Sequence, residues 1–317
     1  MMKKSLIVLT GPTAVGKTKL SIALAKAVGG EIISADSMQV YKYMDIGSAK
    51  IRPEEMEGVP HYLVDVLDPA DEFHIVKFQE MAKEAMEKIY ANRHIPILVG
   101  GTGFYIQAIV NDIDFTENEE NAQVRAKWKQ FAKEHGAEAL HAELAVIDPK
   151  SAESIPVGNV KRVVRALEFY ELSGKRISEH NEEQKAKDSP YNFAYFVLND
   201  HRELLYDRIE KRIDEMLEEG LVEEVQGLKD RGCTKDMVSM KGLGYKEILD
   251  YLDGNLTLEE AVYILKRDTR HFAKRQLTWF RRERSVSWIH KYEYDYNDEK
   301  ILAAMLDILK EKEIITV

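Results

Sequence analysis

The segment from Gly11 to Thr18 carries the clearest chemical signal in the sequence. It reads Gly-Pro-Thr-Ala-Val-Gly-Lys-Thr, which fits the phosphate-loop pattern G-x-x-x-x-G-K-S/T in full. Glycines in such a loop let successive backbone N–H groups surround an anion, and the helix that follows adds partial positive charge from its N-terminus. We expect Lys17 to reach the terminal phosphate and the Thr18 hydroxyl to bind Mg²⁺. The predicted phosphate-binding residues are Gly11, Thr13, Ala14, Gly16, Lys17 and Thr18.

Asp36 is the next candidate, because it follows a second short apolar run, Glu31 to Ala35. Its position alone leaves three roles open. It can bind Mg²⁺ as in kinases and nucleotide hydrolases, take a proton from an incoming nucleophile, or serve only as a helix cap without a chemical role. Asp65 and Asp68 also follow an apolar run, so a metal role can fall to them instead.

Two further segments hold candidate residues. Gly100-Gly-Thr-Gly103 follows the apolar run Ile95 to Val99 and is either part of the site or only a tight turn into a helix. Arg208 and Arg212 are four residues apart and share one face of a predicted helix. They can clamp a diphosphate, while acids beside them can equally pair with them on an ordinary solvated helix.

These candidates need a fold that brings them together. Short apolar runs predict strands, and in the first third of the chain they alternate with segments of helical period. This alternation predicts an α/β fold in which a parallel sheet is covered by helices and carries the phosphate loop. Ligands of such sheets bind beyond the carboxyl ends of the strands, so the candidate loops should meet there. The predicted strands are Ser5 to Leu9, Glu31 to Ala35, His61 to Leu67, Ile95 to Val99 and Phe193 to Leu198, and the first helices are Lys17 to Val28 and Phe73 to Tyr90.

Residues 115–190 differ from the rest of the chain, because they are helical in pattern, highly charged and poor in strand signals. Strand character returns at Phe193, so a helical insertion between two strands is the simplest interpretation. We predict a core domain of residues 1–114 and 191–317 that includes the C-terminal helices, and a helical insertion domain of residues 115–190 that contacts a partner.

Basic residues gather in two places on a chain whose net charge is −10. Between Lys266 and Arg284 there are eight Lys or Arg residues against two acids. Two basic patches favour a polyanionic partner larger than a nucleotide, and the alternative is a pair of solvated helix faces. The first patch is a stripe at helical spacing, Arg267, His271, Lys274, Thr278 and Arg281, and the second, in the insertion, is Lys161, Arg162 and Arg165.

The composition is that of an ordinary globular protein, with 44% hydrophobic and 32% charged residues. Cys233 is the only cysteine, which excludes an internal disulfide and a Cys-based zinc site. No apolar run approaches the length of a membrane span. The single cysteine fits a protein of the reducing cytoplasm, and we expect no membrane partner. We also expect a monomer.

Several stretches together resemble the bacterial tRNA dimethylallyltransferases, the tRNA isopentenyltransferase family, over nearly the full length. Besides the phosphate loop, the most specific are Ser34-Ala-Asp-Ser-Met-Gln-Val-Tyr41 and Ala273-Lys-Arg-Gln-Leu-Thr-Trp-Phe280. The other matches are Asp45-Ile-Gly-Ser-Ala-Lys50, Val99-Gly-Gly-Thr-Gly-Phe-Tyr105, Arg162-Val-Val-Arg-Ala-Leu-Glu168 and Gly242-Leu-Gly-Tyr-Lys-Glu247. The sequence departs from the family where Pro156-Val-Gly-Asn159 replaces the frequent His-Pro-Asn-Asp, which bears on RNA contacts of the insertion.

The resemblance implies transfer of a dimethylallyl group from dimethylallyl diphosphate to N6 of the adenosine 3′ of the anticodon in tRNA, with Mg²⁺ at Thr18 and a flipped-out base. It implies that Asp36 takes the proton of the amine, that Thr102 lies near the same amine, and that Arg208 binds the diphosphate. Together with the basic stripe, it gives as tRNA-contacting residues Asp36, Ser37, Met38, Gln39, Thr102, Arg125, Asn159, Val160, Lys161, Arg162, Val163, Arg165, Lys274 and Arg281.

Other functions compete with this interpretation. A nucleotide or small-molecule kinase would explain the phosphate loop but not the charged insertion or the basic helix. An enzyme that prenylates free adenine nucleotides would leave the basic patches unexplained. An RNA-binding GTPase-like module is the weakest alternative, because the sequence has no guanine-binding Asn-Lys-x-Asp motif.

Overall fold

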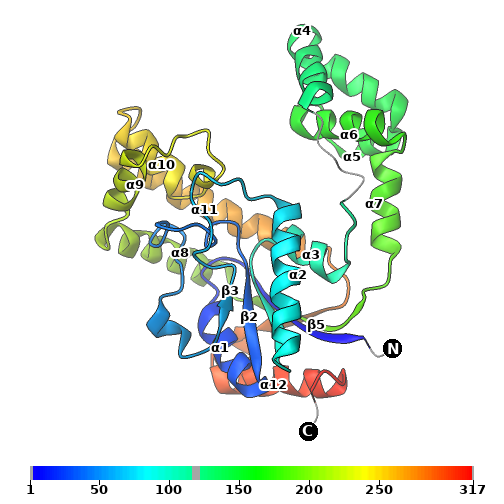
Figure 1. Ribbon diagram of the computed structural model, residues 1–317. Coiled ribbons are helices and arrows are strands. Elements are labelled where there is room, and N and C mark those ends of the chain that lie inside the picture. Colours follow the sequence, from blue (N-terminus) through cyan, green and yellow to red (C-terminus); the bar gives the residue numbers. More distant parts are fainter. Residues whose placement is uncertain (1–2, 116–121, 316–317) are drawn as a thin grey trace. The chain divides into compact units, whose positions relative to one another are not determined.

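The computed structural model describes residues 3–115 and 122–315 (Figure 1). The chain divides into two compact units. One unit contains the described residues up to Val110 and from Pro190 onward, and the other runs from Asn111 to Ser189. In sequence, the second unit is therefore an insertion within the first.

A six-stranded sheet forms the centre of the first unit, in the order β3-β2-β4-β1-β5-β6, and every pair of neighbours is parallel. The predicted α/β fold class is thus confirmed. The central strands are continuous apolar runs because helices cover both faces. Their bounds are β1 Lys4–Thr10, β2 Gly30–Ala35, β3 His61–Tyr62, β4 Ile95–Gly100, β5 Tyr191–Asn199 and β6 Val286–His290.

Alternating side chains of β1 divide the core into two halves. Ile7 and Leu9 face one half, and α1 (Lys17–Val28) and α12 (Asp298–Glu311) cover it with residues such as Leu24 and Met305. Figure 1 shows these two helices close together. Helix α1 starts at the lysine of the phosphate loop and ends at Gly29, whose left-handed backbone closes the helix.

Leu6 and Val8 of β1 face the other half of the core, which six helices complete. The C-terminal helices belong to this half, with α11 packed against α8, α10 and α3. These helices are α2 Ile75–Ala91, α3 Gly103–Val110, α8 Arg202–Glu218, α9 Leu221–Asp230, α10 Tyr245–Leu252 and α11 Leu258–Phe280, and short 3-10 helices lie at η1 Pro53–Met56, η3 Ser239–Lys241 and η4 Lys291–Tyr294.

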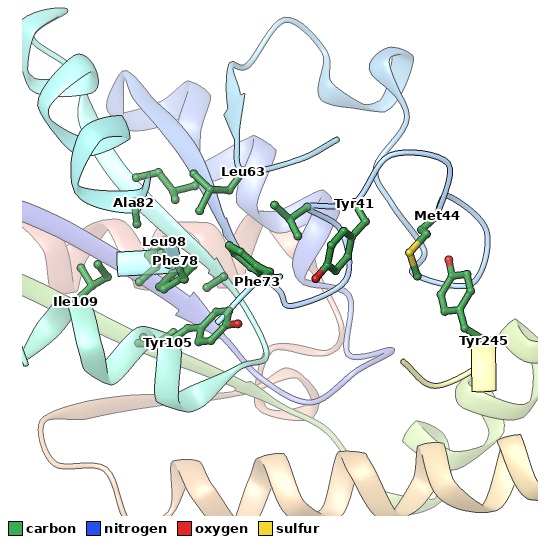
Figure 2. Close-up of a cluster of buried hydrophobic side chains, with 14 of the residues drawn as sticks. Tyr41, Met44, Leu63, Phe73, Phe78, Ala82, Leu98, Tyr105, Ile109 and Tyr245 are labelled. Carbon is green, nitrogen blue, oxygen red and sulfur yellow. The ribbon is translucent and has the colours of Figure 1, made fainter. Parts of the chain in front are cut away.

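An aromatic cluster fixes α3 against α2 (Figure 2). Tyr105 stacks on Phe78 with ring centroids 4.2 Å apart, and Phe73 meets Tyr105 edge-on at 5.7 Å. Phe73 also contacts the ring of Tyr41. Because α3 begins directly after the glycine-rich turn at the end of β4, this cluster determines where that turn lies.

The second unit is helical and has its own small core. The long helix α4 changes direction at Gly136, whose backbone is not helical, and packs mainly on α6. Leu140 and Leu144 from α4 meet Val163 and Leu167 from α6 in this core. The helices are α4 Ala122–Ile147, α5 Pro149–Ser154, α6 Val160–Ser173 and α7 Ile177–Ala186.

Two sequence expectations fail in the sheet. In the predicted strand His61 to Leu67, only His61 and Tyr62 form a strand, and Leu67 adds an isolated bridge to Tyr41. Leu63 and Asp65 take left-handed backbone angles that interrupt the strand. Strand β6 was not predicted, since its edge position leaves it half-buried with a mixed composition. Among the described residues, no helix combines the length and the apolar composition that a membrane crossing needs.

Candidate active site

Three loops leave the sheet from one row of paired residues. Thr10 of β1 pairs with Gly100 of β4, and Gly100 pairs with Ala35 of β2. The hydroxyl of Thr10 donates to the carbonyl of Gly100 at 2.6 Å, which ties the row together. The phosphate loop, Asp36 and Gly101 follow these residues, so the parallel register alone brings the three candidate loops to the same edge.

The phosphate loop contains residues with left-handed backbone angles. Ala14 takes a positive φ of 62° although it is not glycine, so the surrounding structure imposes the loop geometry. Gly16 precedes the first residue of α1 and also has positive φ. The carbonyl of Val15 accepts from Lys291 of η4, which places a second cation beside the loop.

Lys17 is turned onto its own loop. Its Nζ donates to the carbonyls of Gly11 and Pro12 at 3.0 and 2.8 Å. Burial lowers the pKa of Lys17 to about 8, the carboxylate of Asp36 works against this change, and the guanidinium of Arg212 adds to it. Lys17 therefore loses its proton more readily than an exposed lysine, and its charge state is influenced by both Asp36 and Arg212.

The carboxylate of Asp36 is oriented by the backbone that follows it. Its Oδ1 accepts the N–H groups of Met38 and Gln39 at 2.8 and 3.3 Å. The residues that directly follow Asp36 form bends and turns, so these contacts make a local turn and Asp36 is not a helix cap. Within residues 3–115 and 122–315, its Oδ2 has no hydrogen-bond partner and is available for chemistry.

The side chains that follow Asp36 differ in whether they form hydrogen bonds within the fold. Ser37 and Met38 are half-buried, whereas the amide of Gln39 accepts from the Ser34 hydroxyl at 3.1 Å and donates to the carbonyl of Ala49 at 3.2 Å. The side chain of Gln39 therefore holds the 45–50 segment in place, and its contact with RNA stays a prediction.

Close packing explains the glycines around Thr102. A Cβ at Gly100 would lie 2.3 Å from the carbonyl oxygen of Ala35, and one at Gly103 would lie 2.2 Å from the ring of Trp279. The segment is thus more than a tight turn, since β2 and α11 press on it. Thr102 begins the turn into α3, and its hydroxyl has no hydrogen-bond partner within the described part of the chain.

Gln276 is a site residue that sequence reasoning missed. It lies on α11 and is buried, and it accepts the backbone N–H of Thr13 at 2.9 Å. This N–H is therefore already paired within the protein, and the contact between Thr13 and the diphosphate stays a prediction. The only sequence signal was the specific motif around Gln276, which gave no role for the amide.

The two candidate arginines on α8 have different surroundings. Arg208 forms an ion pair at 2.7 Å with the buried carboxylate of Asp200, so its charge is already matched. Arg212, one turn later, lies in the field of Asp36 and near Lys17; burial lowers its pKa and Asp36 raises it. Arg212 is thus a further cation close to the phosphate loop, and diphosphate binding by Arg208 stays a prediction.

A hollow of about 630 Å³ opens beside Thr18 and Arg212. The nearly buried ammonium of Lys50 holds part of its wall by donating to Asp45 and Asp65 at 2.5 and 3.0 Å. Asp65 is thus used as a salt-bridge partner. The hollow is lined by Thr18, Asp45, Ile46, Ala49, Lys50, Ile51, Arg52, Pro53, Glu55, Met56, His61, Val64, Asp65, Arg212, Glu215, Met216 and Glu219.

The donor set around the phosphate loop fits Mg²⁺ better than a metal held by a protein cage. Among the residues that the structure describes, no three His, Cys, Asp or Glu side chains gather to hold a metal ion. Mg²⁺ keeps several waters and often takes few protein ligands beside substrate phosphates. The Thr18 hydroxyl at the start of α1 suits that pattern.

The basic stripe of α11 is exposed as expected, while Leu265 on another side is buried. Arg267 pairs with its neighbour Asp268. Within the described ranges, Lys274 and Arg281 have no acidic partner, so their charges are available to a polyanion.

In the second unit, the residues predicted to contact RNA differ in how far their side chains are exposed. Lys161 and Arg162 are exposed in the first turn of α6, and the side chain of Asn159 caps that helix by accepting the N–H of Arg162. Val163 is fully buried and Val160 packs against the same core. The helical period thus turns the Val163 side chain inward, and the contact of the Asn159 to Val163 region with RNA stays a prediction.

A buried carboxylate organises two further candidates of the second unit. Glu168 is fully buried, and its Oε2 accepts from Arg125 at 2.9 Å and from Arg165 at 3.2 Å. Both guanidiniums remain partly exposed. One buried carboxylate thus holds two partly exposed guanidiniums side by side.

Comparison with known proteins agrees with this geometry. Residues 39–283 match the family described as IPP transferase. A tRNA dimethylallyltransferase of Lachnoclostridium phytofermentans is 59% identical over 310 residues, which are 98% of this chain and 99% of that protein. Among solved structures, the full-length tRNA isopentenylpyrophosphate transferase of Bacillus halodurans is 44% identical with a TM-score of 0.74, covering 98% of each chain.

A eukaryotic dimethylallyltransferase, crystallised while acting on tRNA, is more distant in sequence and similar in fold. It is 30% identical with a TM-score of 0.82, and the match covers 97% of this chain and 80% of that one. The family model and these relatives each cover most of the chain. The chain therefore belongs to the IPP transferase family.

Proposed function

We propose that this protein transfers the dimethylallyl group of dimethylallyl diphosphate to N6 of the adenosine 3′ of the anticodon in tRNA and releases diphosphate. The observation that carries the proposal is the paired row Thr10–Gly100–Ala35, from which the phosphate loop, Asp36 and the Thr102 turn leave the sheet together. A phosphate loop beside a carboxylate suits a reaction whose leaving group is a diphosphate and whose nucleophile must lose a proton.

The phosphate loop binds the leaving group. Its backbone N–H groups and the N-terminus of α1 attract the diphosphate, and Lys17 exchanges its bonds to Gly11 and Pro12 for bonds to phosphate oxygens. Arg212 adds a second positive charge near Lys17. Negative charge grows on the diphosphate as the allylic C–O bond breaks, so these cations stabilise the transition state more than the bound substrate.

Mg²⁺ bound at the Thr18 hydroxyl would add further neutralisation of the diphosphate. We assign no protein carboxylate to the ion. Asp65 already pairs with Lys50, and Oδ1 of Asp68 accepts the N–H of Ala70.

Asp36 acts on the nucleophile. An adenine amine attacks weakly unless its proton is removed as the new C–N bond forms. Two backbone N–H groups hold the carboxylate of Asp36 through Oδ1 and leave Oδ2 to accept that proton. Thr102, whose hydroxyl has no partner among the described residues, supplies a hydrogen bond that orients the base.

The polyanionic partner is the anticodon stem-loop. Lys274 and Arg281 of the first unit and Lys161 and Arg162 of the second present exposed charge to the RNA backbone. We further propose that the protein acts as a monomer in the cytoplasm. Phosphate contacts of this kind position an RNA, and the adenosine itself is selected when it leaves the stack to reach Asp36.

The test measures the mass of an unmodified anticodon stem-loop after incubation with Mg²⁺, dimethylallyl diphosphate and the protein. We expect a gain of one prenyl group. In Asp36→Asn the amide oxygen can still accept the N–H groups of Met38 and Gln39, so the local fold is kept. The amide cannot act as a general base. We expect kcat to fall by about 10²–10⁴-fold with no weakening of dimethylallyl diphosphate binding.

Asp230→Asn is the matched control, since Asp230 is an exposed carboxylate at the end of α9, and it should retain full activity. Phosphoryl transfer from ATP without any prenyl gain would favour the kinase instead. Prenylation of AMP as efficiently as of the stem-loop would favour an enzyme for free nucleotides.

A further inference from the structure

Gln276 joins two loops of the site through a single amide. Its Oε1 accepts the N–H of Thr13 at 2.9 Å, and its Nε2 donates to the carbonyl of Gly101 at 3.0 Å. The side chain is only 6% exposed. The orientation of the amide is unambiguous, because the oxygen must face the N–H group and the nitrogen must face the carbonyl.

The two partners belong to different parts of the chemistry. Thr13 lies inside the phosphate loop, which binds the leaving group in the proposed function. Gly101 directly precedes Thr102, which lies in the turn that receives the nucleophile. The Gln276 amide therefore links the loop that binds the diphosphate leaving group to the turn that receives the adenine nucleophile.

Steric contact reinforces this connection. A Cβ at Gly101 would lie 2.1 Å from Nε2 of Gln276, and one at Gly103 would lie 2.2 Å from Cδ1 of Trp279. Gln276 and Trp279 are neighbours on one face of α11. The turn around Thr102 thus packs tightly against α11 at two points. Because Gln276 also binds Thr13, the position of this turn is coupled to that of the phosphate loop.

We propose that Gln276 is a positioning residue that fixes the spacing of the phosphate loop and the Thr102 turn, and with it the distance between the allylic carbon and the adenine N6. The inference rests on the proposed function for its chemistry. Reacting atoms must approach to about 3–3.5 Å, and a misplacement of about 1 Å can cost about 10²-fold in rate. Loss of the amide should therefore lower kcat while the affinity for dimethylallyl diphosphate changes little.

Two variants separate positioning from simple loss of packing. Gln276→Met keeps a side chain of similar length and removes both hydrogen bonds. Gln276→Glu keeps the acceptor for Thr13, but its ionised form sets a carboxylate oxygen against the carbonyl of Gly101. When protonated, the glutamic acid can donate to that carbonyl and so reproduces both hydrogen bonds of the wild-type amide.

The readout is kcat of each variant divided by that of the wild-type protein at each pH from about 6 to about 8.5, a range across which a buried carboxyl with a raised pKa titrates. We expect this ratio for Gln276→Glu to be reduced about 10–100-fold at the upper end and to recover as the pH falls. For Gln276→Met it should be low at every pH. Gln226→Glu on α9 is the matched control and should stay at wild-type activity throughout.

Amide hydrogen exchange gives a second readout that needs no turnover. In Gln276→Met, peptides containing the phosphate loop and peptides containing the Thr102 turn should lose protection together, with the rest of the sheet unchanged. If the wild-type protein transferred no prenyl group, the proposed function would fail while the exchange result still decided whether Gln276 couples the loops. A flat pH ratio for Gln276→Glu, wild-type kcat in Gln276→Met, or loss of protection in one loop alone would overturn the inference.

Discussion

At the scale of single residues, the charge state of Lys17 depends on its burial within the phosphate loop. Burial brings the pKa of Lys17 down to about 8, so the free protein carries a neutral lysine at alkaline pH. Binding a diphosphate favours the charged form, and above this pKa the complex must therefore take up a proton. We expect the Kd for diphosphate to rise as the pH increases beyond about 8, by up to about tenfold per pH unit.

Lys17→Arg is the comparison that isolates this titration. Arginine keeps its charge throughout the range, while the ligand titrates identically in both measurements. Isothermal titration calorimetry in two buffers of different ionisation enthalpy would also count the protons taken up. An equal pH dependence in the two proteins would show that Lys17 is not the group responsible.

The sequence predicts residue types at the site better than it predicts their partners. Lys17, Thr18 and Asp36 were found from motif and position, because the phosphate loop is a local pattern. Arg212 could not be preferred to Arg208, since only the fold shows that Asp200 neutralises one of them. Non-local hydrogen bonds such as that between Gln276 and Thr13 leave no spacing signal in the sequence.

At the scale of elements, α9 holds the 45–50 segment that walls the hollow beside Thr18. Glu224 accepts the N–H groups of Asp45 and Ile46 at 2.8 and 2.7 Å and that of Gly47 at 3.0 Å. The hydroxyl of Tyr245 donates to the same carboxylate at 2.9 Å. One side chain thus replaces the secondary structure that this turn lacks.

Glu224→Ala removes every one of these acceptor contacts at once. We expect the free energy of unfolding to fall by about 1–3 kcal/mol, because donors that were paired in the fold are left without partners. Urea denaturation followed by circular dichroism measures the change. Glu223→Ala removes the exposed neighbouring carboxylate and should leave the midpoint unchanged, so equal effects of the two substitutions would contradict this role of Glu224.

Elements with strong periodicity were predicted closely, and those shaped by tertiary contacts were not. Helix α1 has the predicted bounds, since glycines mark both of its ends. Strand β3 stops after Tyr62, where Leu63 adopts a left-handed backbone that no apolar pattern reveals. Strand β6 exists because β5 offers it an edge, and an edge strand needs less apolar sequence than a central one.

At the scale of the whole molecule, a net charge of −10 coexists with exposed basic residues on α11 and α6. Long-range repulsion of RNA is screened within about 8 Å at physiological salt, so local contacts decide the affinity. Each protein cation that binds a phosphate releases counterions and steepens the dependence of affinity on salt.

Lys274→Ala should therefore reduce the slope of log K against log salt for an anticodon stem-loop by about 0.7–0.9. Lys310→Ala, on the exposed side of α12, removes the same charge elsewhere and should leave the slope unchanged. Fluorescence anisotropy at several salt concentrations gives both slopes. A slope that fell equally in the two variants would indicate a general charge effect and not a contact at Lys274.

The strand order also governs how the chain is made. β1 leaves the ribosome first, but its neighbour β5 follows only after the entire insertion has been synthesised. The insertion has its own core and can fold during this delay, while the β5-side edge of β1 stays unpaired. An unpaired strand edge invites association with other chains, so a stalled or prematurely ended translation product is the form of this protein most exposed to aggregation and to the chaperones that prevent it.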